Sequence, residues 1–300
     1  MLTTATHDTK RGEDVRARLA LLSEIPVEWA AAVLRWSNMT SAHRTNDWPD
    51  RNTEYFFYQT LVGGWPITVD RLTAYMEKAT REARVHTSWT SPNQDYDTAI
   101  RAFVTSCLGD DAFLSDVERF VGPLVTPGRI NSLAQTLIKL TAPGVPDLYQ
   151  GSEFWSLHLV DPDNRQPVDY RARRRGLAEV RELAPSTLWS QADSGLPKLW
   201  VVLQALQLRN RRPATFGSAS SYRPIEATGP GSAHVVAFER GSDVITIVPR
   251  LVMRGNWSDT RLALPRGSWR NVMTTHVVEG TVEVQELWRD FPVALLERVE

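Results

Sequence analysis

The stretch of residues 141–175 constrains the fold of this chain more than any other part of the sequence. It contains a short apolar run at residues 145–149, bracketed by Pro143-Gly144 on one side and Gly151 on the other. An apolar run of about five residues between turn-forming residues is typical of a buried β-strand. We therefore predict a buried strand at residues 145–149.

Polar, aromatic and acidic side chains follow this predicted strand, before a basic helix that is expected to begin near Val168. They are Gln150, Glu153, Trp155, His158, Asp161, Asp163, Asn164 and Arg165. Barrels and open α/β sheets place their sites directly after buried strands. We therefore expect a site here, although an ordinary strand-to-helix loop is the alternative.

A second candidate strand occupies residues 1–6, a Thr-rich segment. The apolar periodicity of residues 26–140 predicts α-helices almost throughout. Because this helical span is far longer than an ordinary crossover between strands, we expect it to form an inserted helical subdomain.

Individual helices are predicted from apolar spacing and from residues that begin or end helices. Pro26 suits the first turn of one helix, Gly63-Gly64 would end another, and Asp70 would cap a third. The helix that Gly63-Gly64 would end spans residues 53–61. The other helical patterns span residues 13–22, 98–108, 110–121, 128–141, 168–183 and 197–212.

From Pro213 onward the pattern changes to short runs that predict a compact antiparallel β domain, which we expect to be a sandwich. Arg240-Gly241-Ser242 lies between two such runs and indicates a hairpin. The predicted strands span residues 234–239, 243–248, 260–264, 268–273, 281–287 and 293–298.

Charge and cysteine content limit the classes of partner. The net charge is −1, with both signs mixed along the chain, which argues against nucleic acid or an anionic membrane as a partner. The sequence has no apolar run of about 18 residues and no signal-peptide pattern. Its one cysteine, Cys107, lies in an apolar helical pattern and is interpreted as a structural thiol, which fits a reducing cytoplasm.

The strongest single candidate for chemistry is Asp8, which follows His7 at the end of the first candidate strand. A carboxylate and an imidazole at the mouth of a strand can share one pocket, and Lys10 and Arg11 would keep the carboxylate ionised. The alternative is that His7 and Asp8 only satisfy backbone groups between the strand and the next helix.

The loop after the second candidate strand offers further oxygen atoms. Glu153 could bind a hydroxyl group or orient Arg11, or it could accept hydrogen bonds from amides of the next turn. Residues 161–165 (DPDNR) superficially resemble a calcium loop. They lack the ligand spacing and central glycine of an EF-hand, so we expect no metal there.

Three stretches together resemble the maltooligosyltrehalose synthases, a family of the α-amylase-type glycoside hydrolase superfamily. They are residues 6–18 (THDTKRGEDVRAR), residues 85–92 (VHTSWTSP) and residues 141–170, with PGVPDLYQGSE and LVDPDNRQPVDY. The resemblance extends over nearly the whole chain. Ser156 and Gln166 depart from the family pattern, which has Asp and Arg at these positions.

The resemblance implies the C-terminal portion of such an enzyme, with an α/β part followed by an all-β domain. Residues 1–25 would hold the seventh strand and a helix of a (β/α)8 barrel, and residues 26–140 a helical insertion. Residues 141–212 would hold the eighth strand and closing helices, and residues 213–300 a β-sandwich domain. Trp29, Trp36, Trp65 and Trp89 of the insertion could help to exclude water from the site.

The resemblance also implies a reaction without a cofactor. The enzyme would convert the reducing-end α-1,4 linkage of a maltooligosaccharide to an α,α-1,1 (trehalose) linkage by retaining intramolecular transglucosylation. Asp8 would match the carboxylate that stabilises the oxocarbenium-like transition state. Substrate contacts are expected from His7, Lys10, Arg11, Tyr149, Glu153, Asp161, Asp163 and Arg165.

In this superfamily the nucleophile and the acid/base follow the fourth and fifth strands, so they would belong to a missing N-terminal half of the barrel. We therefore expect the 300 residues alone to be inactive. Two alternatives remain open at this stage. The chain could come from another α-glucan-active enzyme, a hydrolase or a maltose-to-trehalose mutase, or it could be a glucan-binding fragment without catalysis.

Overall fold

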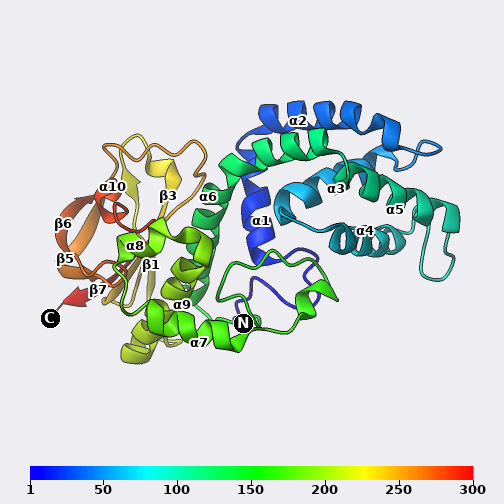
Figure 1. Ribbon diagram of the computed structural model, residues 1–300. Helices are drawn as coiled ribbons and strands as arrows, with labels where there is room; N and C mark the ends of the chain where they lie inside the picture. The colour runs from blue at the N-terminus through cyan, green and yellow to red at the C-terminus, as the bar shows by residue number, and fades with distance from the viewer. Residues whose placement is uncertain (300) are drawn as a thin grey trace. The chain divides into compact units, whose positions relative to one another are not determined.

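The structure, a computed structural model, describes residues 1–299, which form two compact units (Figure 1). Unit 1 comprises Met1–Thr6, Pro127–Ser156 and Pro167–Glu300. Unit 2 comprises His7–Thr126 and Leu157–Gln166. The chain is helical in its first half and ends in an antiparallel sheet, as predicted.

Unit 2 is built from helices, in agreement with the periodicity of residues 26–140. They are α1 (Glu13–Leu19), α2 (Pro26–Met39), α3 (Arg51–Gly64), α4 (Val69–Ala83), α5 (Gln94–Leu108) and the first part of α6 (Asp111–Thr141). Two separate helices were predicted at residues 110–121 and 128–141. This prediction is wrong, because both segments belong to one helix, α6, which continues through Pro123 and Pro127. The boundary between the two units falls within this helix, before Pro127.

Side-chain caps define the starts of three of these helices. Asp50 caps α3, Thr68 caps α4 and Asn93 caps α5. The predicted cap of α4, Asp70, is therefore wrong. Asp70 lies in the first turn instead, where a carboxylate still interacts favourably with the helix dipole.

Aromatic side chains fill the core of unit 2. Trp36, Phe57 and Phe113 are fully buried, and the rings of Trp36 and Phe113 meet edge to face at 6.2 Å. The indole N–H of Trp36 donates to Asp116 at 2.7 Å. Trp29 and Trp36 are thus core residues rather than a cover over a site, whereas Trp89 is 56% exposed.

The two candidate strands of unit 1 form only one parallel bridge, between Leu2 and Pro146. The Leu2 N–H donates to the carbonyl of Val145 at 2.7 Å, and the Asp147 N–H donates to the carbonyl of Leu2 at 2.8 Å. The prediction of a buried strand is wrong for this chain, since Val145 is 68% exposed. Within residues 1–299 no further strand pairs with either segment, so the ladder is not extended.

Three more helices belong to unit 1: α7 (Tyr170–Glu179), α8 (Pro185–Ser190) and α9 (Leu196–Arg211). Helices α7 and α9 confirm the helical patterns predicted at residues 168–183 and 197–212, whereas α8 was not predicted. One core of the unit forms where α9 and residues 127–141 of α6 cover a face of the sheet (Figure 1). Its members include Leu137, Leu140, Val201, Ala205, Val244, Val248 and Leu295.

The sheet contains seven antiparallel strands within the described residues, in the order β1-β3-β4-β7-β5-β2, with β6 paired to β5. They are β1 (Tyr222–Pro224), β2 (Ala227–Thr228), β3 (Val235–Arg240), β4 (Val244–Pro249), β5 (Arg261–Asn271), β6 (Val277–Glu283) and β7 (Ala294–Val299). The predicted hairpin is confirmed, because Arg240 pairs with Val244 around Gly241, whose φ is 57°. Hydrogen bonds link all these strands into one sheet. The predicted sandwich, in which two sheets face each other, therefore stays a prediction.

The second half of the β domain differs from the prediction in two places. The strands expected at residues 260–264 and 268–273 are one strand, β5, whose register shifts between Ala263 and Ser268. The strand expected at residues 281–287 ends at Glu283 and turns into a short helix, α10 (Val284–Leu287). A second core with Ile245, Trp269 and Leu296 lies on the other face of the sheet, which explains why every residue of β4 is buried.

Candidate functional site

Unit 2 brings two of the predicted segments together. Residues 7–12 pair with residues 157–166 through an antiparallel bridge between Arg11 and Leu159 and a 2.8 Å hydrogen bond from the Gly12 N–H to the carbonyl of His158. The buried side chain of Asn164 donates to the carbonyl of His7 at 2.8 Å. The loop after the second candidate strand thereby fixes the backbone that carries His7 and Asp8.

Asp8 and His7 interact with each other on an accessible surface of unit 2. Nε2 of His7 lies 3.2 Å from Oδ2 of Asp8, and the side chains are 56% and 82% exposed. At this exposure the carboxylate and the imidazole are both accessible to a polar ligand. The arrangement is compatible with both interpretations of the sequence. His7 and Asp8 could share a pocket that binds a ligand, or they could only satisfy backbone groups before α1.

Lys10 joins this segment to α4. Its Nζ lies 2.7 Å from Oε2 of Glu82, and this hydrogen bond is the main reason that the pKa of Lys10 is raised. The negative charge of Asp8 also contributes to the raised pKa of Lys10. Lys78 extends the network, because its Nζ donates to the carbonyl of Asp161 at 2.7 Å and lies 4.0 Å from Glu82.

Asp163 is held by two parallel hydrogen bonds from one guanidinium. Nε and Nη2 of Arg71 donate to its two carboxylate oxygens at 2.9 and 2.8 Å, and the Leu159 N–H donates to Oδ2 at 2.8 Å. Burial alone would raise the pKa of Asp163, but these hydrogen bonds outweigh it and hold the pKa below its ordinary value. Asp163 therefore fixes the loop rather than presenting an open carboxylate.

Asp161 and Arg165 pair with each other across one turn of the same loop. Oδ1 of Asp161 lies 2.6 Å from Nε of Arg165, whose side chain is 56% exposed. A cavity of about 210 Å³ lies between this loop and α4. It is lined by Asp70, Arg71, Tyr75, Lys78, Asp161, Asp163 and Gln166, among others.

Arg11 is directed toward α3. Nη1 donates to Gln59 at 3.3 Å, Nη2 donates to Thr60 at 3.2 Å, and the guanidinium lies 4.7 Å from the ring centre of Phe56. Burial raises the pKa of Tyr75, and the positive charge of Arg11 nearby opposes this rise. These contacts give Arg11 a structural task in unit 2 whether or not it meets a substrate.

The residues of α4 that build this site were missed at the sequence level. Arg71, Tyr75, Lys78 and Glu82 recur at intervals of four, three and four residues, so they share one face of the helix. Of α4, only the cap was predicted from the sequence, apart from its place in the general resemblance. A polar stripe beside an apolar one was the available signal.

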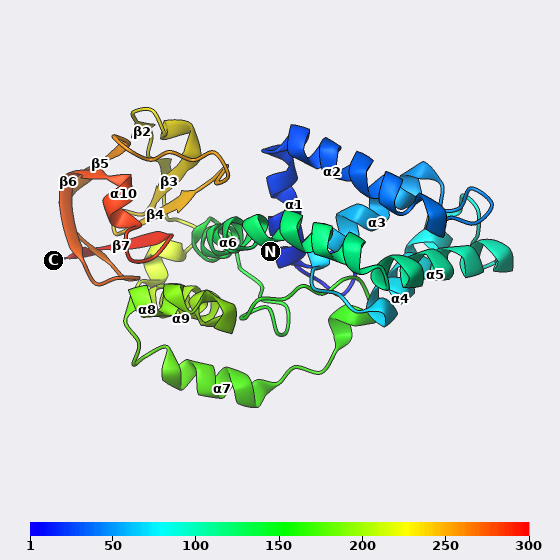
Figure 2. The same cartoon turned by 45° about the horizontal axis from the view of Figure 1, so that its top comes forward.

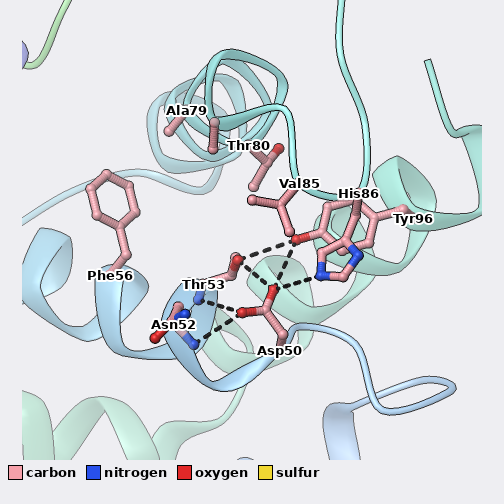
Figure 3. Close-up of a pocket in the computed structure, with 10 residues that line it drawn as sticks. Asp50, Asn52, Thr53, Phe56, Ala79, Thr80, Val85, His86 and Tyr96 are labelled. Carbon is pink, nitrogen blue, oxygen red and sulfur yellow. Dashed lines mark hydrogen bonds and ion pairs between the residues drawn. The ribbon is translucent and has the colours of Figure 1, made fainter. Parts of the chain in front are cut away.

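A second cavity of unit 2, of about 260 Å³, was also missed (Figure 3). Asp50 forms its polar wall and accepts hydrogen bonds from the Asn52 N–H at 3.0 Å and the Thr53 hydroxyl at 2.8 Å, with His86 Nε2 at 3.3 Å. Figure 3 shows Ala79, Val85 and Phe56 on the opposite side. Burial would raise the pKa of Asp50, but hydrogen bonds from Thr53 and Asn52 and the nearby His86 lower it.

Tyr149 and Glu153 belong to unit 1. The carbonyl of Tyr149 accepts hydrogen bonds from the N–H and hydroxyl of Ser152 at 3.0 and 2.6 Å, in a turn that includes Gly151 with φ 84°. Oε2 of Glu153 faces Nε of Arg173 at 3.7 Å, beyond hydrogen-bond length. Because Asp8 lies in unit 2, its convergence with Tyr149 and Glu153 on one ligand stays a prediction.

The structure also bears on metal-binding clusters and membrane-spanning helices. Among residues 1–299, no group of three or more His, Cys, Asp or Glu side chains is arranged to hold a metal ion. In the same part of the chain, no helix combines the length and apolar character needed to span a bilayer. Cys107 is buried, and burial raises the pKa of its thiol.

Comparison with known proteins identifies relatives over almost the entire chain. No family model matches it. Two Mycobacterium tuberculosis proteins, from strains CDC 1551 and H37Rv, are assigned as maltooligosyl trehalose synthases. Each is 40% identical over 308 aligned positions, which cover 99% of this chain and 37% of the relative.

Solved structures give the same result. Maltooligosyltrehalose synthase from Arthrobacter ramosus matches with a TM-score of 0.89 and 35% identity, and a hypothetical maltooligosyl trehalose synthase from Sulfolobus tokodaii matches with 0.81 and 32%. Each match covers 99% of this chain and 38% of the other, so the chain spans little more than a third of the proteins it resembles. The chain is therefore related over nearly its whole length to a part of the maltooligosyltrehalose synthases, which confirms the resemblance indicated by its three sequence motifs.

Proposed function

We propose that these 300 residues form the C-terminal portion of an enzyme that converts the reducing-end α-1,4 linkage of a maltooligosaccharide to an α,α-1,1 linkage. The observation that carries the proposal is the 40% identity to maltooligosyl trehalose synthases over 99% of the chain. The motif around His7 and Asp8 lies within the matched region. The substrate class follows from the names of the relatives.

The parallel bridge between Leu2 and Pro146 supports the assignment of residues 1–6 and 145–149 to neighbouring barrel strands. All strands of a (β/α)8 barrel run parallel, and each needs a partner on both sides. The exposure of Val145 is what such a strand would show without the remaining strands. The second core, which residues of β3, β4, β5 and β7 share on the face of the sheet opposite α6 and α9, supports a sandwich-type arrangement of the C-terminal domain.

We assign Asp8 the stabilisation of positive charge in the transition state. Retaining glycosyl transfer needs a nucleophilic carboxylate and an acid/base about 5–5.5 Å apart. As the glycosidic C1–O4 bond breaks, the nucleophilic carboxylate forms a covalent bond to C1 and the acid donates its proton to O4 of the leaving glucose. The released glucose then turns, its anomeric hydroxyl attacks C1, and the proton of that hydroxyl returns to the base. A third carboxylate beside the sugar, Asp8, favours the oxocarbenium-like state of both steps.

His7 and the loop of residues 157–166 would position this carboxylate. The 3.2 Å contact between His7 and Asp8 limits the orientations of the acidic side chain, and Asn164 holds the backbone at His7. The loop is fixed in turn by the ion pair between Asp163 and Arg71. His7, Lys10, Arg11, Tyr149, Glu153, Asp161 and Arg165 are proposed to contact sugar hydroxyls directly or through one another.

The nucleophile and the acid/base are proposed to belong to the rest of such an enzyme, after its fourth and fifth barrel strands. The 300-residue chain alone is then expected to form no trehalose-ended product. Transfer to a sugar rather than to water further requires that water be excluded while the glucosyl group is bound to the enzyme. We expect this exclusion of water to need the complete barrel as well.

A chimaera tests the proposal. This chain replaces the matching segment of the Mycobacterium tuberculosis relative, and products from maltohexaose are separated by chromatography. We expect trehalose-ended products from the chimaera, and a fall in kcat of at least about a hundredfold in Asp8→Asn with a much smaller change in KM. Asp95→Asn, an exposed carboxylate on α5, is the matched control and should leave kcat unchanged.

Two results would contradict the proposal. Full activity of Asp8→Asn would remove Asp8 from the reaction, and glucose release without any trehalose-ended product would favour the hydrolase alternative. Trehalose-ended product formed by the purified 300-residue chain would refute the assignment of the nucleophile and acid/base to other residues.

A further inference from the structure

Unit 1 contains a groove of about 550 Å³ that the proposed reaction does not use. Three tryptophans from separate elements line it: Trp189 in α8, Trp257 in the loop before β5, and Trp288 directly after α10. Figure 2 shows α8 and α10 beside the strands of unit 1. The volume lies within the range of about 300–1,000 Å³ that is typical of small-molecule sites.

The indole rings are held in place by the fold. The rings of Trp257 and Trp288 meet at 87° with their centres 5.4 Å apart, and Nε1 of Trp257 donates to the carbonyl of His234 at 3.2 Å. Trp189 packs against Phe291 at 6.3 Å. All three tryptophans are half-buried, so each ring is anchored on one side and still reaches the surface. Rings fixed before binding lose little conformational freedom when a ligand stacks on them.

The polar side chains of the groove carry no net charge. Glu286 and Arg289 pair with each other, at 58% and 65% exposure, and Gln285 adds an exposed amide. An anionic or cationic ligand would meet no unbalanced charge of opposite sign here. A neutral ligand with many hydroxyl groups fits better, because it can stack an apolar face on indole and hydrogen-bond to the amide and the paired charges.

We propose that this groove binds a segment of α-1,4-linked glucan, through residues that take no part in the proposed reaction. The choice of an α-glucan rests on the proposed function, since a maltooligosaccharide is the substrate inferred for the enzyme. The groove would hold glucosyl units of a long substrate and raise the local concentration of chains that carry a reducing end.

Binding is measured on the 300-residue chain itself, by native electrophoresis in gels with soluble amylose and by calorimetric titration with maltoheptaose. We expect the wild-type chain to be retarded by amylose. Trp288→Ala and Gln285→Ala should each weaken maltoheptaose binding by about fivefold or more, consistent with the loss of one stacking or hydrogen-bonding contact. Tyr222→Ala, at an exposed aromatic on β1 outside the groove, should bind as wild type does.

Circular dichroism and thermal unfolding identify variants that fail to fold. Gln285 is an exposed residue of α10, so Gln285→Ala keeps the test decisive if Trp288→Ala unfolds. Unchanged binding in folded groove variants would overturn the proposal, and so would a wild-type chain with no retardation. Equal affinity for cellohexaose would overturn the assignment to α-glucan.

The two proposals fail in different experiments. Asp8→Asn should retain amylose retardation in the 300-residue chain while it loses product formation in the chimaera. If the chimaera forms no trehalose-ended product but Trp288→Ala and Gln285→Ala still lose retardation, the proposed reaction is contradicted. The proposal that the groove binds α-glucan is then supported. If Asp8→Asn abolishes retardation and the groove variants do not, the glucan is bound at Asp8 and the groove proposal falls.

Discussion

Arg71 and Asp163 form a two-point contact, in which Nε and Nη2 of the guanidinium donate to separate carboxylate oxygens at 2.9 and 2.8 Å. The pair ties α4 to the loop of residues 157–166. Nη2 of Arg71 also donates to the carbonyl of Leu157 at 2.9 Å. One side chain thus fixes both the start and the middle of the loop that holds His7.

Replacement of Arg71 by lysine should destabilise unit 2 although the charge is kept. Lysine is a point donor and cannot form two parallel hydrogen bonds. We expect a loss of about 1–3 kcal/mol in the free energy of unfolding, measured by urea titration. Arg101→Lys is the control, because Arg101 is 62% exposed and pairs with Glu77 at the surface. A loss as large in that variant would contradict the argument.

The Asp163 carboxylate should also make stability depend on pH. Its pKa in the folded protein is below the ordinary value of about 3.9. The stabilisation is therefore complete above that value and is lost as the pH falls through the folded-state pKa. Between about pH 5 and pH 2, the free energy of unfolding should fall more steeply for wild type than for Asp163→Asn, which is less stable at neutral pH. The free energies are measured by urea titration at each pH. An equal fall with pH for wild type and Asp163→Asn would contradict the prediction.

Two aspartates near helix starts should behave differently on substitution. Asp50 caps α3 and accepts hydrogen bonds from two backbone N–H groups, whereas α4 is capped by Thr68 and not by Asp70. Asp50→Ala should cost about 1 kcal/mol of unfolding free energy, and Asp70→Ala no more than a few tenths. Thermal and urea unfolding of both variants gives the comparison, and equal losses would restore Asp70 as a cap.

Glycine to alanine substitutions should have opposite signs at two helical positions of unit 2. A Cβ at Gly63 of α3 would lie 2.7 Å from Cγ1 of Val15, whereas a Cβ at Gly122 of α6 meets no atom within 4 Å. Gly63→Ala should destabilise by about 1–3 kcal/mol through overpacking of α3 on α1. Gly122→Ala should stabilise by about 0.5–1 kcal/mol through helix propensity. Unfolding curves of the two variants check both signs.

The features that were predicted correctly depend on neighbours in sequence. The helices of residues 26–140 follow from apolar spacing, and the β3–β4 hairpin follows from its turn at Gly241. The failures involve competition between local signals. The patterns at residues 110–121 and 128–141 predicted two helices where the structure has one, α6, and Thr68 and Asp70 both suit the start of α4.

The features that were predicted wrongly, or missed, depend on partners far along the chain. The run at residues 145–149 is bounded by turn-forming residues, as a buried strand would be, but it contains Pro146 and Asp147, and its burial needs other strands to cover it. Arg71, the partner of Asp163, was missed because it lies 92 positions earlier and no spacing rule connects the two residues. The exposure of Asp8 was likewise visible only in the structure, and its role in the reaction stays a prediction.

The pairing of Leu2 with Pro146 has a consequence for the order of events during synthesis. All of unit 2 up to Thr126 lies between these two residues in the sequence. When the ribosome makes the chain from its amino end, Leu2 emerges long before the backbone groups that it binds. The helices of unit 2 can condense first, and the contact between Leu2 and residue 146 can form only after the whole stretch between them has been made.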